Sequence, residues 1–222
     1  MCGRYTLIKP ADTLAALFGM EGSLGLSPRY NIAPTQFVPA VRALRPGEPE
    51  LALLRWGLIP SWAKDPAIGA RTINARGETA AQKPSFRAAF RRRRCLIPAD
   101  GFYEWVKEGG RKQPYYIQLR GEAPFAFAGL WESWTGAEGE TLETCTIITC
   151  EANEGLRPLH PRMPVILPRE NYDLWLDPAA QDPAALQPLL RPYPAGETVF
   201  RPVSAQVNSP KNDGPECIAG AR

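Results

Sequence analysis

The chain has 222 residues, of which 44% are hydrophobic and 22% are charged. These proportions are typical of a folded globular protein and exclude a disordered one. No run approaches 18 apolar residues, so we expect neither a membrane-spanning helix nor a membrane partner. The first residues lack the basic-then-apolar order of a signal peptide. We therefore expect a cytoplasmic protein. If the source is a bacterium, we expect it in the cytoplasm or the nucleoid.

Cysteine and histidine are placed in a way that argues against disulfides and metal sites. The five cysteines are odd in number and show no paired spacing, which is unlike a disulfide framework. Histidine occurs once, at His160, and no CxxC pair is present. We therefore predict no metal site and no cofactor.

The net charge of +3 is unevenly distributed along the chain. Residues 1–111 carry 17 Lys and Arg against 9 Asp and Glu, whereas residues 112–222 carry 9 against 14. Arginine outnumbers lysine 20 to 6. Either the first half forms a phosphate-binding face, or a GC-rich genome has enriched arginine throughout. Composition alone favours the second interpretation.

The chain alternates short helical and strand-like segments without a linker or an internal repeat. Helical spacing and proline starts predict helices over residues 12–18, 85–90, 168–176 and 183–190. Strand-like runs cover residues 38–44, 51–56, 95–97, 102–106, 115–119, 125–131, 144–150 and 199–207. Gly109-Gly110 lies between two of these runs and predicts a hairpin turn.

The order of these elements predicts the fold class. Strands outnumber helices and do not alternate with them, which favours an α+β fold with a mainly antiparallel sheet or barrel and short flanking helices. We expect one domain over residues 1–222, and a monomer by default. Trp56, Cys95, Cys145 and Cys150 fall in strands, so we expect them in the core.

Cys2 is the first candidate for chemistry. Removal of Met1 would leave a cysteine with a free α-amine, and such an amine is about one-tenth neutral at pH 7, whereas a lysine is almost entirely charged. The amine can form an imine with an aldehyde, and the adjacent thiol can close onto the imine to give a thiazolidine. Position alone does not distinguish this chemistry from a chance cysteine.

Three further residues are ambiguous when each is taken alone. Glu104 lies in an aromatic strand, where it is either a partly desolvated acid or an exposed strand residue. His160 is of a residue type suited to proton transfer, but a lone histidine is more often structural. Asn74 by itself is more often a turn residue.

Several motifs recur in one order along nearly the whole chain. They are residues 1–5 (MCGRY), 31–35 (NIAPT), 56–60 (WGLIP), 73–79 (INARGET), 99–105 (ADGFYEW), 160–164 (HPRMP) and residues in 203–217. Together they resemble the SRAP family (SOS-response-associated peptidase), over residues 2–218. The resemblance implies a single SRAP-type domain that recognises abasic sites in single-stranded DNA.

The resemblance also implies roles for individual residues. Cys2 would form a stable, reversible thiazolidine crosslink to the ring-opened abasic aldehyde after removal of Met1, and so shield the lesion. Asn74 would orient its amine, Glu104 would act as acid and base, and His160 would assist formation and reversal of the imine. Arg76 and Arg162 match phosphate-contacting arginines, and Arg4 is a candidate to join them.

Two further features, Trp62 and the arginines at 91–94, each allow a DNA-binding and a structural interpretation. Trp62 lies in an expected loop and either stacks on a base near the lesion or packs over the sheet. Residues 91–94 are four successive arginines, which on a helix point in all directions, so we interpret them as a solvated helix end with one or two members near DNA.

Two other functions compete with covalent lesion recognition. An N-terminal-nucleophile cysteine peptidase would use Cys2 with His160 or Glu104 as base. A non-covalent single-strand binder would use the basic first half, and its affinity would fall with salt by a slope near −0.7 per phosphate contacted. Strand cleavage by β-elimination from the imine, an AP-lyase activity, could accompany the first function.

Overall fold

The structure is a computed structural model that describes residues 2–20 and 25–221. Five short α-helices flank its strands: α1 (Ala11–Phe18), α2 (Gly77–Ala80), α3 (Arg87–Arg92), α4 (Tyr172–Leu176) and α5 (Pro183–Leu186). Short 3-10 helices span Pro66–Arg71, Arg169–Asn171, Gln187–Leu189, Ala195–Glu197, Ala205–Asn208 and Pro215–Ile218. Within the described ranges, no helix is both long and apolar enough to cross a membrane.

The larger sheet closes into a small barrel. Its strands are β3 (Phe37–Ala43), β4 (Pro49–Trp56), β5 (Asn74–Arg76), β6 (Arg94–Ala99), β9 (Phe125–Thr135), β10 (Thr141–Glu151), β11 (Arg162–Pro164) and β12 (Ile166–Leu167). Strands β10, β4, β3, β6 and β9 pair in that order, and β9 pairs back with β10, which closes a ring of five. Only the pairings of β10 with β4 and β5 are parallel among the described strands. Closure leaves the ring without a free edge.

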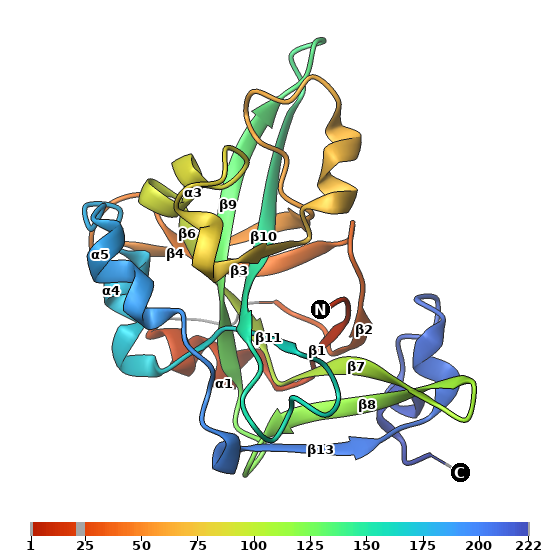
Figure 1. The fold of residues 1–222 in the computed structure, drawn as a ribbon. Helices are drawn as coiled ribbons and strands as arrows, with labels where there is room; N and C mark the ends of the chain where they lie inside the picture. The colour runs from red at the N-terminus through yellow and green to blue at the C-terminus, as the bar shows by residue number, and fades with distance from the viewer. Residues whose placement is uncertain (1, 21–24, 222) are drawn as a thin grey trace.

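The smaller sheet packs beside the barrel (Figure 1). Its strands run in the order β13 (Thr198–Pro202), β8 (Arg111–Leu119), β7 (Gly101–Glu108), β1 (Tyr5–Leu7) and β2 (Arg29–Ile32). Gly109 and Gly110 connect β7 to β8 with φ values of 54° and 83°, as the predicted hairpin turn requires. The predicted α+β fold with mainly antiparallel strands is therefore confirmed.

The buried residues form one main core and a smaller second cluster. Trp56, Cys95, Cys145 and Cys150 lie in the main core, as predicted. The second cluster contains Cys217, which sequence patterns left unassigned, packed with Tyr103, Tyr116, Val203 and Val207. It fastens the chain's last segment to the smaller sheet.

The prediction of a strand over residues 199–207 is wrong beyond Pro202. Val203 still donates to the backbone oxygen of Pro114 on β8 at 3.0 Å, but Pro114 has no N–H to donate in return, so the pairing ends there. Ser204 then accepts a hydrogen bond from the backbone N–H of Gln206 at 3.2 Å, which starts the 3-10 helix Ala205–Asn208. The pattern also failed to reveal the short strands β1, β2, β5, β11 and β12, which have two to four residues each.

The interpretation of residues 91–94 as a solvated helix end is wrong for Arg94. This residue begins β6 and is only 2% exposed. Its guanidinium donates hydrogen bonds to the backbone oxygens of Trp175 and Phe90 at 2.7 and 2.8 Å. Arg93 pairs with the buried Glu132 at 2.6 Å, so only Arg91 and Arg92 lie on the surface. The run therefore anchors α3 and α4 to the barrel.

Candidate functional site

Cys2 is fully buried directly before β1, and Asn74 of the other sheet contacts its backbone. It precedes β1, and the backbone N–H of Tyr103 on β7 donates to the oxygen of Arg4 at 3.0 Å, which continues the β1–β7 pairing toward the N-terminus. The thiol of Cys2 lies 3.8 Å from the same oxygen. Burial, and then the charge of Glu104, raise the pKa of the Cys2 thiol well above its ordinary value. The thiol is therefore protonated at neutral pH.

Asn74 reaches Cys2 from the other sheet. It begins β5, which runs parallel to β10 with Asn74 opposite Ile147. The Nδ2 of Asn74 donates a hydrogen bond to the backbone oxygen of Cys2 at 2.8 Å. Its Oδ1 is buried and has no hydrogen-bond partner in the described part of the chain. An acceptor in that position can accept a hydrogen bond from an N–H of an amine on Cys2.

Glu104 approaches Cys2 from β7. Its side chain is 6% exposed between the aromatic neighbours Tyr103 and Trp105. Its negative charge contributes to the raised pKa of the Cys2 thiol. The alternative of an exposed strand glutamate is therefore wrong. The structure brings together Cys2, Asn74 and Glu104, which are separated by at least 30 residues in the sequence.

His160 and Arg162 lie where the loop after β10 returns to form β11. The Nδ1 of His160 accepts a hydrogen bond from the backbone N–H of Arg162 at 3.0 Å. That bond belongs to the tautomer with the proton on Nε2; in the other tautomer Nδ1–H donates to the backbone oxygen of Arg162 at 3.0 Å. His160 is half-buried, in the loop expected from sequence. Its backbone contact ties the orientation of its ring to the start of β11.

Arg76 and Arg162 lie on opposite sides of β10. Arg76 ends β5 opposite Thr149, and Arg162 begins β11 opposite Glu151. Arg76 is exposed, whereas Arg162 donates to the backbone oxygen of Thr149 at 2.6 Å. The structure thus gathers two of the predicted phosphate-binding arginines at the C-terminal end of β10, although they come from different halves of the sequence.

Arg4 has a different environment from the other two arginines. Its Nη1 donates to Oδ1 of Asn31 at 2.8 Å and to the backbone oxygen of Val207 at 2.9 Å. Its guanidinium also lies 5.9 Å from the centre of the Trp105 ring. Burial lowers the pKa of Arg4 from its ordinary value. Arg4 therefore clasps the C-terminal segment, and its predicted contact with DNA stays a prediction.

Trp62 lies on the surface of the protein. Its side chain is 60% exposed, so the alternative of a tryptophan packed over the sheet is wrong. Its loop is held by Trp134, whose Nε1 donates to the oxygen of Ala63 at 2.7 Å. Two positions on β10 give the distance from this loop to Asn74: Leu142 pairs with Trp134, and Ile147 lies opposite Asn74. They are five residues apart, which at a strand rise of about 3.4 Å per residue is ~17 Å along β10.

Sequence reasoning missed two residues that shape this edge. Glu78 forms a two-pronged ion pair with Arg162, with distances of 3.0 and 2.9 Å. Thr149 accepts from Arg162 through both its backbone and its side chain. Glu78 could have been found, because it lies in the same motif as Asn74 and Arg76. Thr149 carried no such signal, since its role depends on strand register.

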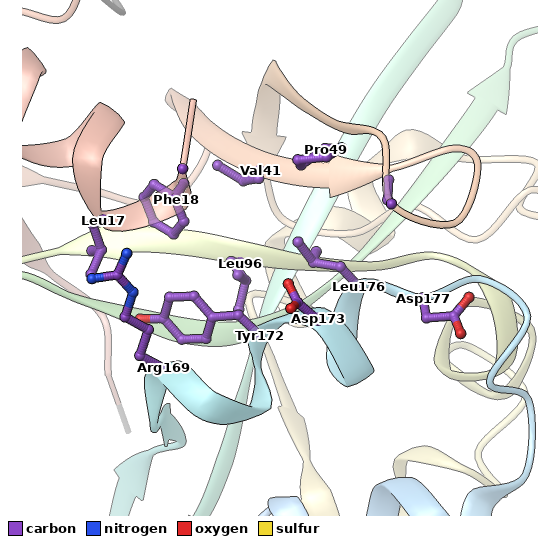
Figure 2. Close-up of a pocket in the computed structure, with 13 residues that line it drawn as sticks. Leu17, Phe18, Val41, Pro49, Leu96, Arg169, Tyr172, Asp173, Leu176 and Asp177 are labelled. Carbon is purple, nitrogen blue, oxygen red and sulfur yellow. The ribbon is translucent and has the colours of Figure 1, made fainter. Parts of the chain in front are cut away.

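A separate apolar pocket of about 430 Å³ lies between α1, α4 and the barrel (Figure 2). Phe18 and Leu17 of α1 face Tyr172 and Leu176 of α4 across it. None of the eight predicted site residues lines it. Among the described residues, no three His, Cys, Asp or Glu side chains are grouped to hold a metal ion.

Comparison with known proteins agrees with the geometry. The family model described as SOS response associated peptidase (SRAP) matches residues 1–210. "Abasic site processing protein YoqW" of Bacillus subtilis (strain 168) is 48% identical and covers 98% of this chain and 99% of its own. "Abasic site processing protein HMCES" of Gallus gallus is 36% identical over 86% of this chain and 66% of its own. A solved structure of a Bacteroides thetaiotaomicron protein has a TM-score of 0.88 at 29% identity and covers 100% of both chains.

Proposed function

Because the chain belongs to the SOS response associated peptidase (SRAP) family, we propose that it recognises abasic sites in single-stranded DNA and links to them covalently through Cys2. The relatives named as abasic site processing proteins support this substrate. The proposal requires removal of Met1, which lies outside the described residues. Once Met1 is absent, Cys2 carries a free α-amine beside its thiol.

The contact that carries the proposal is the hydrogen bond from Asn74 to the backbone oxygen of Cys2. It fixes the main chain of residue 2 while the Oδ1 of Asn74 is left as a buried acceptor. An unpartnered buried acceptor is costly, and an N–H of the α-amine would satisfy it. That bond would direct the lone pair of the neutral amine away from Asn74, toward an incoming aldehyde.

The proposed reaction proceeds in three balanced steps. The neutral amine adds to the aldehyde carbon of the ring-opened abasic sugar and forms a carbinolamine. Glu104, as a general acid, protonates the carbinolamine hydroxyl, which leaves as water, and the N–H proton released as the C=N bond forms returns to the Glu104 carboxylate, which gives a neutral imine. The thiol sulfur of Cys2 then bonds to the imine carbon while its proton goes to the nitrogen, which closes the thiazolidine ring. One water is released in total, and reversal consumes one.

His160 and the edge arginines have supporting roles in this proposal. His160 would present an Nε2–H toward the reacting groups and assist formation and reversal of the imine. Arg76 and Arg162 would bind phosphates on either side of the lesion. Trp62 would stack on a base farther along the strand.

The test is crosslinking of an abasic oligonucleotide. Protein whose intact mass demonstrates the loss of Met1 is incubated with the single-stranded substrate, washed at high salt and run on a denaturing gel. We expect a slow DNA–protein band that is absent with Cys2→Ser and retained with the matched control Cys217→Ser. An unchanged band with Cys2→Ser would overturn the proposal.

The alternatives give different results in the same experiment. A non-covalent binder would retain DNA at low salt and release all of it in the wash and the gel. A cysteine peptidase would cleave a generic peptide in a reaction that stops with Cys2→Ala and would give no DNA band. A shortened oligonucleotide beside the band would indicate strand cleavage by β-elimination.

A further inference from the structure

Glu78 occupies the position next to Arg162 where a phosphate of bound DNA would lie. It belongs to α2, directly after β5, and its two carboxylate oxygens accept from Nη1 and Nη2 of Arg162. Phosphate binds arginine through the same pair of parallel hydrogen bonds. The carboxylate is therefore an internal stand-in for the ligand that this arginine is proposed to bind.

Arg162 has little remaining capacity for a second anion. A guanidinium has five N–H donors. Within the described residues, Nε donates to the Oγ1 of Thr149 at 3.3 Å, Nη2 donates to Thr149 and Glu78, and Nη1 donates once to Glu78. One N–H on Nη1 is left. A phosphate can bind Arg162 with two hydrogen bonds only if it displaces Glu78.

Glu78 carries its negative charge under ordinary conditions. Burial alone would raise the pKa of its carboxyl, but hydrogen bonds from Arg162 and the charges of Arg162 and Arg76 lower it overall. The side chain of Glu78 is 48% exposed, whereas that of Arg162 is 16% exposed. Glu78 can therefore swing into solvent while Arg162 stays fixed by Thr149.

We propose that Glu78 is a specificity-determining residue that competes with DNA phosphates for Arg162 and so weakens the binding of undamaged single-stranded DNA. This inference rests on the proposed function in taking single-stranded DNA as the ligand. Because electrostatic binding alone is then weak, retention of a strand depends on the covalent reaction at Cys2. The protein thus releases intact DNA and holds lesions.

The experiment measures binding of a fluorescently labelled, lesion-free single-stranded oligonucleotide by anisotropy at several NaCl concentrations. Glu78→Gln removes the charge and keeps the size of the side chain. We expect affinity to rise about two- to fivefold, the range for breaking an exposed ion pair. We also expect the slope of log affinity against log salt to steepen by about 0.7, one phosphate contact. A purely structural role would weaken binding instead.

Two controls isolate the contact with Arg162. Glu151→Gln removes the same charge from the residue opposite Arg162 on β10, where the side chain is exposed. It should raise affinity less than Glu78→Gln does. In an Arg162→Gln background the Glu78 substitution should have no effect. Equal effects of the two glutamine variants, or a gain that persists without Arg162, would overturn the inference.

Folding and the proposed function are monitored separately. Melting curves verify that Glu78→Gln is folded, and Glu78→Ala provides a second variant expected to change affinity in the same direction. The abasic crosslinking assay runs in parallel. Crosslinking by the wild type with no gain for either Glu78 variant overturns only this inference. A gain without any crosslinking supports the competition at Arg162 and overturns only the covalent function.

Discussion

The pocket beside α1 and α4 and the cluster around Cys2 are built in opposite ways. Most of the residues that line the pocket are apolar, and Arg169, Asp173 and Asp177 also line it (Figure 2). Around Cys2, polar side chains come from both sheets: Asn74 of β5 donates to its backbone oxygen, and the charge of Glu104 of β7 contributes to the raised pKa of its thiol. The comparison teaches that the proposed reactive groups gather where the sheets meet, and that hollow volume alone does not mark them.

Stability and chemistry should therefore respond to substitutions on different sides of the molecule. The pocket side is fixed by Arg94, which joins β6 to α4 through backbone oxygens. The cluster around Cys2 is fixed by Asn74, which joins the barrel to residue 2. Substitutions at these two residues provide the strongest test of the separation.

Arg94→Met should give the largest effect on stability. Several backbone oxygens lose their buried donor, so we expect the free energy of unfolding to fall by about 3 kcal/mol or more. Denaturant unfolding measures this change. The exposed Arg91→Met should stay within about 0.5 kcal/mol of the wild type. A lower salt slope of DNA binding for folded Arg94→Met would contradict the structural role.

Asn74→Ala should have the opposite profile. Loss of the hydrogen bond frees the main chain at Cys2, and misplacement on this scale lowers rates about 100-fold. Single-turnover crosslinking measures the rate, and a melting curve should change little because Asn74 is half-buried. Gln82→Ala removes an exposed amide nearby in sequence and should leave the rate unaltered. Equal rates for both variants would break the comparison.

Trp62→Ala should weaken DNA binding without affecting either fold or chemistry. Loss of one stacking platform lowers binding by about 1–3 kcal/mol. Anisotropy with an undamaged strand measures the loss, and Trp62→Phe should recover part of it. Unaltered affinity in Trp62→Ala would remove this loop from the proposed interface.

The smallest effect concerns the Cys2 thiol in protein that retains Met1. Because burial and Glu104 raise its pKa, we expect alkylation by iodoacetamide to be slow at pH 8 and to keep rising above pH 9. Free cysteine, with a pKa of about 8.5, levels off in that range. Peptide mass mapping follows Cys2, with urea-unfolded protein as the control. A plateau below pH 9 would show an exposed, ordinary thiol.

Sequence patterns predicted most of the long strands and the fold class because period and composition are local properties. Motifs located Glu104 on a strand and His160 in a loop, and both locations are confirmed. The pairing of β10 with both β5 and β11 could not be predicted, because a local sequence pattern does not determine which strand pairs with which. Thr149 was missed for that reason, and it is the residue that fixes Arg162.

Arg94 illustrates a second limit of sequence reasoning. Four successive arginines are typical of a solvated helix end, and two of them fit this description. Burial of the fourth, Arg94, depends on α4, which lies about 80 residues later in the sequence. The last backbone oxygens of α4 need hydrogen-bond donors, and Arg94 supplies them. Burial of a charged residue is decided by such distant partners.

The clasp between Arg4 and the C-terminal segment sets an order of events during synthesis. Arg4 needs the oxygens of Val207 and Asn208, and Asp213 holds the backbone of Tyr30 and Asn31. Translation at about 5–20 residues per second separates residue 4 from residue 207 by roughly 10 to 40 seconds. Throughout that interval the start of the chain lacks its final enclosure, which would give a processing enzyme access for the proposed removal of Met1. The first residues to be made are thus among the last to be enclosed.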